Sequence, residues 1–385
     1  MVCRSANRFL VFSGEEPRPI TGGGTLLTEI VHHLATLGSV CVVFPRPTRQ
    51  FDQLINFGSD AARVTLVELL PRKSTLLNTV KRVASLNLSM VTQFNSKENS
   101  RQIHRVLDSF QATKMVIVSS AACSLVSKLA PQVIRDARLY LFDYEPDLYE
   151  NHLSGIRNKL RANLEKIRSL SSVKHSISSC RQVGTVSYRD LEKLRALNPN
   201  ATNMNVVAPI MRPRDHLKQS NGRKRFAILP TNYQFPPNRR SLDWFFRAVL
   251  PHVSPELQIV ITGQDDHVKS LSALCSKAPN VSFMGLLERR EFEALISQSA
   301  FAINPTICGS GFQIKLLDAI ASGVPVVSTT FSNPFGDRIA SSDDAEIFAT
   351  LINEFGRDAA RQFDYQAFFS NAKDEWAKFL GLAQE

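Results

Sequence analysis

The chain has 385 residues, enough for two α/β domains of about 150 to 200 residues each, and its 43% hydrophobic and 21% charged residues are typical of a globular protein. No apolar run reaches the roughly 18 to 20 residues of a membrane-spanning helix, which argues against insertion across a bilayer. The formal charge of +11 indicates an acidic partner. Because the basic stretches 72–105 and 157–168 contain a single aromatic residue, Phe94, we expect no nucleic acid partner.

The first half of the chain alternates between β-rich apolar runs and helical patterns. The runs predict strands at 8–13, 40–44, 115–118 and 139–142. Three glycines, Gly22 to Gly24, follow a polar loop and precede a helical pattern that Gly38 ends. The order strand, loop, helix, strand is typical of a parallel sheet with crossover helices.

A helix over residues 156–170 carries apolar side chains at helical spacing. Leu160, Leu164 and Ile167 share one face, so we expect that face to lie in the core and most of the basic residues to point away from it.

The α/β alternation begins again after a polar, basic stretch at 212–225, which we interpret as a linker. Strands are predicted at 225–229, 258–262, 281–284, 300–304 and 325–328, and helices at 241–249, 289–298 and 313–322. The predicted domains are residues 1–208, residues 209–362 and a C-terminal helix at 363–385 that packs toward the first domain. The fold class is α/β, with two Rossmann-like doubly wound domains facing across a cleft where a ligand binds.

Residues 304–329 are the most informative stretch of the sequence. They predict a strand, a glycine-containing loop and a helix that begins near Phe312, whose free backbone amides and positive dipole end suit a phosphate group. Lys315 lies in the first turn of that helix, where its ammonium can reach the same anion. Asp318 lies on the same face three residues later, and its carboxylate can accept hydrogen bonds from ribose hydroxyls.

This stretch resembles the retaining GT-B glycosyltransferases of the group 1, family-4-like type. Their pattern is a glycine-rich loop, a lysine, a carboxylate followed by Ala-x-Ala-x-Gly, and Pro-Val-Val with a small polar residue. Here it is met by Gly309, Gly311, Lys315, Asp318 to Gly323 and Pro325 to Ser328. The resemblance covers residues 225–330 well and the N-terminal half in outline.

The resemblance implies a set of residues that contact a nucleoside diphosphate sugar. They are Gly23, Gly24, Asn238, Gly263, Gly285, Gly309, Gly311, Phe312, Lys315, Leu316 and Asp318. A simple tight turn at Gly22 to Gly24 is an equal alternative. Lys315 is expected to stabilise the leaving diphosphate, with no metal and no cofactor required.

Two positions depart from the family pattern. Ser310 stands where many relatives carry a glutamate beside the transferred sugar, so the resemblance does not name the sugar. The Gly-Arg and Lys pair that many relatives aim at the diphosphate is also missing, and Arg239 or Arg240 is its candidate replacement.

Two acidic residues follow the predicted strand at 139–142, at the edge of the sheet where α/β sites gather. Asp143 and Glu145 are candidate catalytic residues that orient the acceptor, with capping of the next helix as the equal alternative. His32 and His33 fall inside an amphipathic helix and are expected to be packing or surface residues and not a catalytic base.

The function expected from these observations is transfer of a sugar from a nucleoside diphosphate sugar to a saccharide or lipid-linked acceptor, with retention. The alternatives are a catalytically degenerate nucleotide-binding protein and a nucleotide-sugar epimerase. Because the six cysteines form neither a Cys-x-x-Cys pair nor a metal-spaced cluster and no secretory signal is recognisable, we expect a cytoplasmic protein. Contact of its basic surface with the anionic inner face of a membrane is a further hypothesis.

Overall fold

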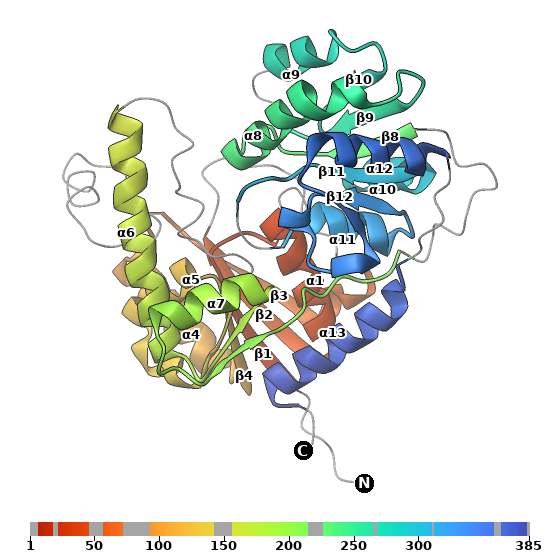
Figure 1. The fold of residues 1–385 in the computed structure, drawn as a ribbon. Helices are drawn as coiled ribbons and strands as arrows, with labels where there is room; N and C mark the ends of the chain where they lie inside the picture. Colours follow the sequence, from red (N-terminus) through yellow and green to blue (C-terminus); the bar gives the residue numbers. More distant parts are fainter. Residues whose placement is uncertain are drawn as a thin grey trace. The chain divides into compact units, whose positions relative to one another are not determined.

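A computed structural model of the chain describes residues 7–17, 22–45, 57–71, 93–141, 156–214, 226–264, 268–309, 312–357 and 363–382. The chain divides into two compact units, Met1–Ile210 with Asn371–Glu385, and Met211–Ser370. Each unit contains one parallel sheet with helices on both of its faces, so the predicted pair of doubly wound α/β sheets is confirmed (Figure 1).

The sheet of the first unit has the strand order β3-β2-β1-β4-β5-β6-β7, and its strand pairs are parallel. The strands are β1 (Asn7–Ser13), β2 (Gly38–Pro45), β3 (Val64–Leu69), β4 (Lys114–Val118), β5 (Arg138–Leu141), β6 (Gln182–Thr185) and β7 (Met204–Val206). The chain reverses its direction of travel across the sheet between β1 and β4. A reversal of this kind is where doubly wound sheets leave room for a ligand at the carboxyl ends of the strands.

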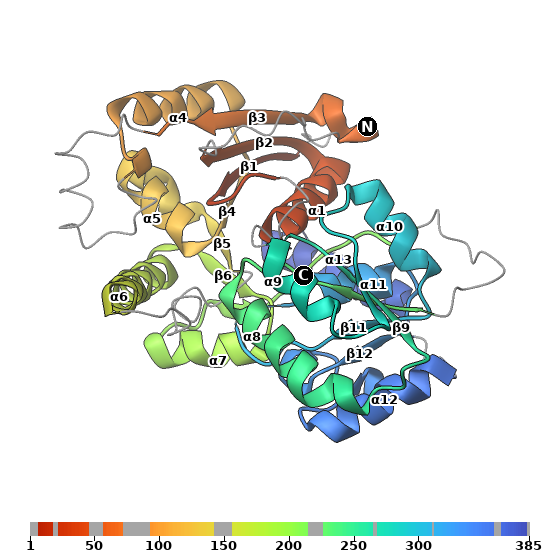
Figure 2. The same ribbon diagram turned by 90° about the horizontal axis from the view of Figure 1, so that it is seen from above.

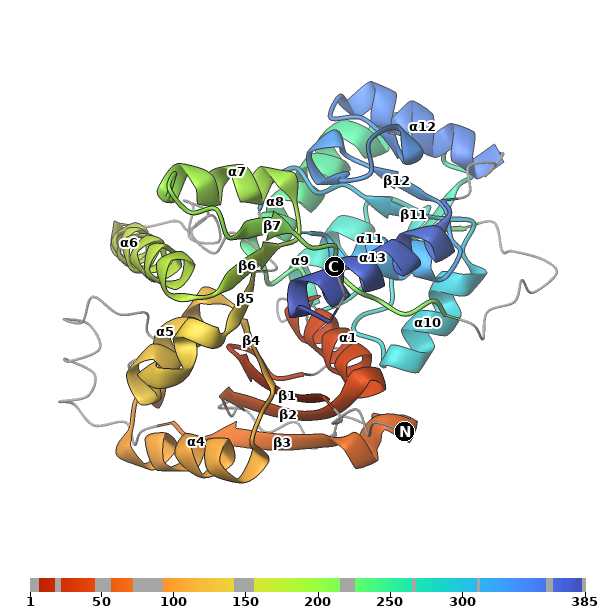
Figure 3. The same cartoon turned by 90° about the horizontal axis from the view of Figure 1, so that it is seen from below.

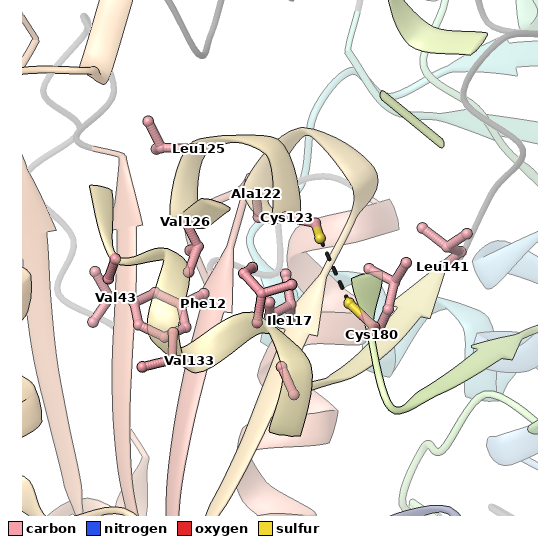
Figure 4. Close-up of a cluster of buried hydrophobic side chains, with 14 of the residues drawn as sticks. Phe12, Val43, Ile117, Ala122, Cys123, Leu125, Val126, Val133, Leu141 and Cys180 are labelled. Carbon is pink, nitrogen blue, oxygen red and sulfur yellow. Dashed lines mark hydrogen bonds between the residues drawn. The ribbon is translucent and has the colours of Figure 1, made fainter. Parts of the chain in front are cut away.

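Helices cover both faces of this sheet, as the view from below shows (Figure 3). One face carries α1 (Gly22–Leu37) and the last ten residues of α13 (Tyr365–Leu380). The other carries α4 (Lys97–Phe110), α5 (Ser120–Leu129), α6 (Ile156–Ser179) and α7 (Tyr188–Leu197). Apolar side chains of this second group pack on the strands and form the core shown in Figure 4, where the Sγ atoms of Cys123 and Cys180 lie 3.6 Å apart.

The end of α13 is fixed to the first unit by hydrogen bonds to backbone carbonyl groups. Trp376 donates from Nε1 to the carbonyl of Ala208 at 3.0 Å, and Arg138 donates from Nε to the carbonyl of Phe379 at 2.6 Å. The fully buried ring of Trp376 lies 4.7 Å from the ring of Tyr140. The C-terminal residues are therefore part of the core of this unit.

The buried face of α6 differs from the predicted one. Leu160 and Ile167 are 65% and 59% exposed. The buried face carries Val173 and Ile177 together with small hydroxyl side chains, and Ser172 donates from Oγ to the carbonyl of Ser120 on α5 at 3.0 Å. Small side chains let two helices approach closely, and their mutual hydrogen bonds offset the loss of water. The prediction from the apolar spacing was wrong because Leu160 and Ile167 face outward.

One basic residue of α6 is an exception to the expectation that most of them point away from the core. Arg168 is 3% exposed and donates from Nη1 to Oε1 of Glu165, one turn earlier, at 2.6 Å. The pair buries a charge together with its counter-charge, which lowers the cost of removing both from water.

The sheet of the second unit has the order β10-β9-β8-β11-β12-β13, also parallel. Its strands are β8 (Phe226–Pro230), β9 (Gln258–Thr262), β10 (Val281–Phe283), β11 (Phe301–Asn304), β12 (Val326–Ser328) and β13 (Ala340–Ser341). One face is covered by α8 (Pro236–Trp244), α9 (Val268–Cys275) and α12 (Ala345–Arg357), the other by α10 (Arg289–Gln298) and α11 (Ile314–Ala321), as seen from above (Figure 2).

The first helix of this unit begins earlier than predicted. A helix was expected at 241–249, but α8 starts at Pro236, because two prolines suit the first helical turn, where no backbone donor is needed. The chain then continues through a wider π-helical turn over Phe245–Val249. By contrast, α10 occupies the predicted residues, fixed by a capping box between Glu288 and Glu291.

The described residues contain neither a membrane-spanning helix nor a metal-binding cluster. None of their helices is long and apolar enough to cross a membrane. Among the same residues, no group of three or more His, Cys, Asp or Glu side chains is placed to hold a metal ion.

Candidate functional site

The candidate site lies where the sheet of the second unit changes direction. The chain moves from β8 through β9 to β10 toward one edge, and from β11 through β12 to β13 toward the other. The helices that follow the two central strands, α8 and α11, therefore begin side by side at the carboxyl edge. This is the place at which doubly wound sheets bind their ligands.

The N-terminus of α11 has no side-chain cap among the described residues. Its N-cap residue, Gln313, makes no side-chain capping hydrogen bond, and its first turn contains no acidic residue. The helices α4, α5 and α7 differ, because serines at positions 96, 119 and 187 accept hydrogen bonds from their first turns. Uncapped amide groups together with the helix dipole favour an anion at α11.

Lys315 lies in the first turn of α11, as predicted, and is half-buried. No residue in the described part of the chain forms a hydrogen bond or an ion pair with its ammonium group. Withdrawal of this group from water lowers the pKa of Lys315 to about 8. An anion bound at the helix N-terminus would favour the charged form of the amine and so raise that pKa again.

Asp318 is buried on the same helix but is not free of partners. Arg289, at the start of α10, donates from Nη2 to its Oδ1 at 2.5 Å, and Nη2 of Arg214 lies 3.7 Å from the same oxygen. The sequence placed Lys315 and Asp318 together but gave no sign of either arginine, since 29 residues separate Arg289 from Asp318. Contact of Asp318 with ribose stays a prediction.

The loop between β11 and α11 is fixed against the start of α8. The backbone amide of Ile307 donates to Oγ of Ser241 at 3.2 Å, and Sγ of Cys308 donates to the carbonyl of Pro237 at 3.5 Å. Gly309 follows with φ of +118°, a conformation that favours glycine. The other predicted glycine of this loop, Gly311, lies outside the described residues, as does Ser310.

Beneath this loop lies a buried network of amide and hydroxyl groups that the sequence analysis missed. Asn304, the last residue of β11, donates from Nδ2 to Oγ of Ser328 at 3.1 Å and of Ser332 at 3.0 Å, and it accepts from Oγ1 of Thr306 at 2.8 Å. Oγ1 of Thr329 donates to the carbonyl of Thr306. The network rigidifies the chain just before the loop. Its only signal in the sequence is the hydroxyl-rich run at 328–332.

Two of the predicted nucleotide-binding glycines have left-handed backbone conformations at strand ends. Gly263 has φ of +130°, and a Cβ added to it would lie within 1.5 Å of the carbonyl oxygen of Thr231. Gly285 has φ of +75° and open space around it. The amide of Gly263 donates to the carbonyl of Gly285 at 2.8 Å, which joins the ends of β9 and β10.

Three other predicted contact residues have structural partners. Asn238 donates from Nδ2 to the carbonyl of Asn232 at 3.0 Å and so closes the loop before α8. The half-buried ring of Phe312 packs on Phe335 with a centroid distance of 5.6 Å. Leu316 is 1% exposed in the core. Their contacts with a nucleotide are untested predictions.

The two candidate substitutes for the missing diphosphate-binding pair have different surroundings. Arg239 donates to the carbonyl of Tyr233 at 3.4 Å and lies over its ring at 5.3 Å. Arg240 is exposed, and its charge acts on the thiol of Cys308, beside the loop that precedes α11. Arg240 is therefore the better placed of the two to meet an anion there.

In the first unit, the glycines predicted to approach the diphosphate form the first turn of α1 and not a loop or tight turn. This turn lies at the carboxyl end of β1, where the sheet changes direction. A Cβ on Gly23 would lie 2.3 Å from Oε2 of Glu15, so a carboxylate already lies against this helix N-terminus. Contact of Gly23 and Gly24 with a diphosphate stays a prediction.

Asp143 and Glu145, the candidate acceptor-orienting acids, lie outside the described residues. The histidines of α1 pack in the interior, one of the two expected placements: Nδ1 of His32 lies 2.9 Å from Oδ2 of Asp60, and burial lowers the pKa of His33 to about 4. Sequence analysis missed Ser119, which follows β4 with φ of +88° and caps α5. Strained residues of this kind are found at functional sites.

Comparison with protein families identifies the second unit. Residues 231–358 match the family model described as Glycosyl transferases group 1. This part of the chain is a group 1 glycosyltransferase domain. The match includes β9 to β13 and α11, with both Lys315 and Asp318.

Solved structures resemble the whole chain, including the first unit, over 97% of its residues. They include the sucrose-phosphate synthase of Thermosynechococcus elongatus (TM-score 0.67, 12% identity, 95% of that chain) and Anabaena HepE in complex with UDP and glucose (TM-score 0.60, 12% identity, 95% of that chain). WaaG, a glycosyltransferase involved in lipopolysaccharide biosynthesis, gives a TM-score of 0.58 at 16% identity, with 96% of that chain covered. The fold that carries the group 1 glycosyltransferase domain is therefore GT-B, as the sequence predicted.

A curated relative from Klebsiella pneumoniae, an uncharacterized 44.6 kDa protein in the cps region, is 25% identical over 153 residues. The match spans 36% of this chain and 39% of the relative.

Proposed function

We propose that this protein is a glycosyltransferase that moves a sugar from a nucleoside diphosphate sugar to a saccharide or lipid-linked acceptor, with retention of anomeric configuration. The observation that carries the proposal is Lys315, in the first turn of α11 inside a group 1 glycosyltransferase domain. Its amine is partly desolvated and has no partner among the described residues, and the N-cap residue Gln313 makes no side-chain capping bond. The complex of HepE with UDP and glucose supports a nucleoside diphosphate as the leaving group and UDP as the first probe.

In the proposed reaction, the bond from the anomeric carbon to the diphosphate breaks while an acceptor hydroxyl oxygen bonds to that carbon. The proton of the hydroxyl group passes to the departing diphosphate oxygen. Negative charge develops on the diphosphate oxygen as it leaves. The ammonium group of Lys315 and the first amides of α11 stabilise this charge, because they are fixed in place before the reaction begins. No metal or cofactor is assigned a role, and Asp143 and Glu145 orient the acceptor.

The direct test measures nucleoside diphosphate release from UDP-glucose, UDP-galactose, UDP-N-acetylglucosamine and GDP-mannose, with and without a panel of saccharide and lipid-linked acceptors. Acceptor-stimulated release supports the proposal. A protein that binds UDP but releases no nucleoside diphosphate with any pair is the catalytically degenerate alternative, which Ser310 favours. Isomerisation of a donor sugar without an acceptor identifies an epimerase.

The pKa of Lys315 predicts a pH dependence for nucleotide binding. The amine is charged below about pH 8 and loses its proton above it, so the affinity for UDP should be constant below pH 8 and fall about tenfold per pH unit well above it. Calorimetric titration from pH 6.5 to 9.5 tests this prediction. A Lys315→Met variant should bind weakly and lack this fall, whereas an equal fall in both proteins would assign the titration to another group.

A contact with an anionic membrane extends the proposal to the acceptor side. Leu160 and Ile167 lie outside on α6, one above the other, and Lys166 and Lys174 belong to the same helix. Exposed apolar side chains beside basic ones are typical of helices that bind the surface of anionic bilayers. A lipid-linked acceptor would be met at such a surface.

Flotation with lipid vesicles tests the membrane contact. Vesicles that contain phosphatidylglycerol should carry the protein and vesicles of pure phosphatidylcholine should not. The double variant Leu160→Ser, Ile167→Ser should lose most of this binding and keep its activity on a soluble acceptor. Equal binding by both proteins would remove α6 from the proposal.

A further inference from the structure

We infer that Arg289 is a positioning residue of the candidate nucleotide site, where it orients Asp318 so that one carboxylate oxygen meets the ribose hydroxyls of the donor. This inference rests on the proposed function and deepens it, because it assigns a role to a residue outside the group 1 sequence pattern.

The carboxylate of Asp318 is contacted on one oxygen. The hydrogen bond from Arg289 and the closest approach of Arg214 are both to Oδ1. The side chain of Asp318 is 9% exposed, so rotation of the carboxylate is restricted by its neighbours as well as by this bond. Oδ2 is the oxygen that a ligand at the carboxyl edge of the sheet would use.

Arg289 is itself held in place by a second carboxylate and by an aromatic ring. Its Nε donates to Oε1 of Glu293, one turn further along α10, at 2.7 Å, and its guanidinium lies over the ring of Phe292 at 5.7 Å. Nε of Arg214 lies 3.4 Å from the same Glu293 oxygen. A planar guanidinium with two fixed acceptors has one orientation, which it imposes on Asp318.

The charges of this cluster balance. Two arginines, Arg214 and Arg289, face two carboxylates, Glu293 and Asp318, across distances of 2.5 to 3.7 Å. The buried carboxylate of Asp318 thus has counter-charges beside it, which offset the cost of its removal from water. A carboxylate with one oxygen occupied is a directional acceptor for a ribose.

The experiment compares two ligands that differ by one hydroxyl, UDP and 2′-deoxy-UDP, by calorimetric titration of the full chain. The wild-type protein should prefer UDP by about tenfold, the effect of one hydrogen bond to a charged group. The Arg289→Gln variant should bind UDP about tenfold more weakly than the wild type does. Its preference for UDP over 2′-deoxy-UDP should be less than about threefold. Arg289→Lys keeps the positive charge but lacks the planar N–H donors of the guanidinium group. Its affinity for UDP and its preference for UDP should lie between those of the wild type and of Arg289→Gln. Arg290→Gln, on the exposed neighbouring arginine, should match the wild type.

The outcomes separate this inference from the function on which it rests. A merely structural role for Arg289 predicts that Arg289→Gln weakens both ligands equally and leaves the preference for UDP intact, which would overturn the inference. Unchanged UDP affinity in a variant with a normal thermal unfolding midpoint would also overturn it, while the proposed function would survive. If the wild-type protein binds neither ligand nor any donor, both fail. Arg289→Lys keeps the test decisive if Arg289→Gln does not fold.

Discussion

Replacement of Lys315 by alanine should lower the turnover number by about 100- to 1,000-fold, the usual effect of removing one fixed group that stabilises a developing charge. The reason is geometric and electrostatic. The ammonium group lies at the N-terminal end of α11, has no protein partner among the described residues, and is partly desolvated, so its charge is poorly screened. Initial rates of nucleoside diphosphate release, measured at saturating donor and acceptor, provide the test.

The same substitution should not destabilise the fold, which distinguishes a functional lysine from a structural one. A desolvated amine without a partner opposes folding, so its removal should leave the thermal unfolding midpoint unchanged or raise it. Lys315→Arg is the matched control and should retain part of the activity because it keeps the charge. Near-normal turnover in Lys315→Ala would place the leaving-group site elsewhere.

Replacement of Gly263 by alanine should destabilise the second unit by about 4 kcal/mol or more, at the upper end of what single substitutions do. Its φ of +130° is unfavourable for alanine, and the new methyl group would fall 1.5 Å from the carbonyl oxygen of Thr231. The ends of β8 and β9 would have to separate. That movement would break the 2.8 Å bond from Thr231 to Thr262 and the bond from Gly263 to Gly285.

Gly285→Ala supplies the control, because Gly285 shares the positive φ but has no neighbour within 4 Å of its added Cβ. It should cost about 1 to 2 kcal/mol, the strain of a left-handed conformation alone. Urea denaturation of the two variants separates steric overlap from backbone strain. Equal urea midpoints for the two variants would mean that the ends of β8 and β9 separate without loss of stability. That result would contradict the prediction that Gly263→Ala is the more destabilising substitution.

The alternation of apolar runs and helical patterns predicted two parallel sheets and their central strands, but it did not predict β3, β6, β7 or β13. Strands such as β9 and helices such as α10 appear at the predicted residues because their apolar side chains are buried in the pattern that each element requires. The pattern failed for α6. There Ser172 contacts α5, and Glu165 and Arg168 form a buried ion pair, and none of these side chains carries a hydrophobic signal. Leu160 and Ile167 lie outside.

The candidate site was predictable only where its residues are close in sequence. Lys315 and Asp318 share one helix, so their spacing revealed them. Arg289 and Arg214 reach Asp318 from other segments, and the fold alone brings them together. The glycines at 22–24 are close in sequence, yet their structure was predicted wrongly. Their composition favoured a loop, but they form the first turn of α1.

The burial of Trp376 gives this chain a built-in spectroscopic probe. The sequence contains two tryptophans, and the other, Trp244, belongs to α8 and lies 5.7 Å from the ring of Phe348. One fluorophore thus belongs to each unit. In a Trp376→Phe variant, the remaining emission would report the unfolding of the second unit. The difference in emission between the parent protein and this variant would report the unfolding of the first unit, so neither needs an attached dye.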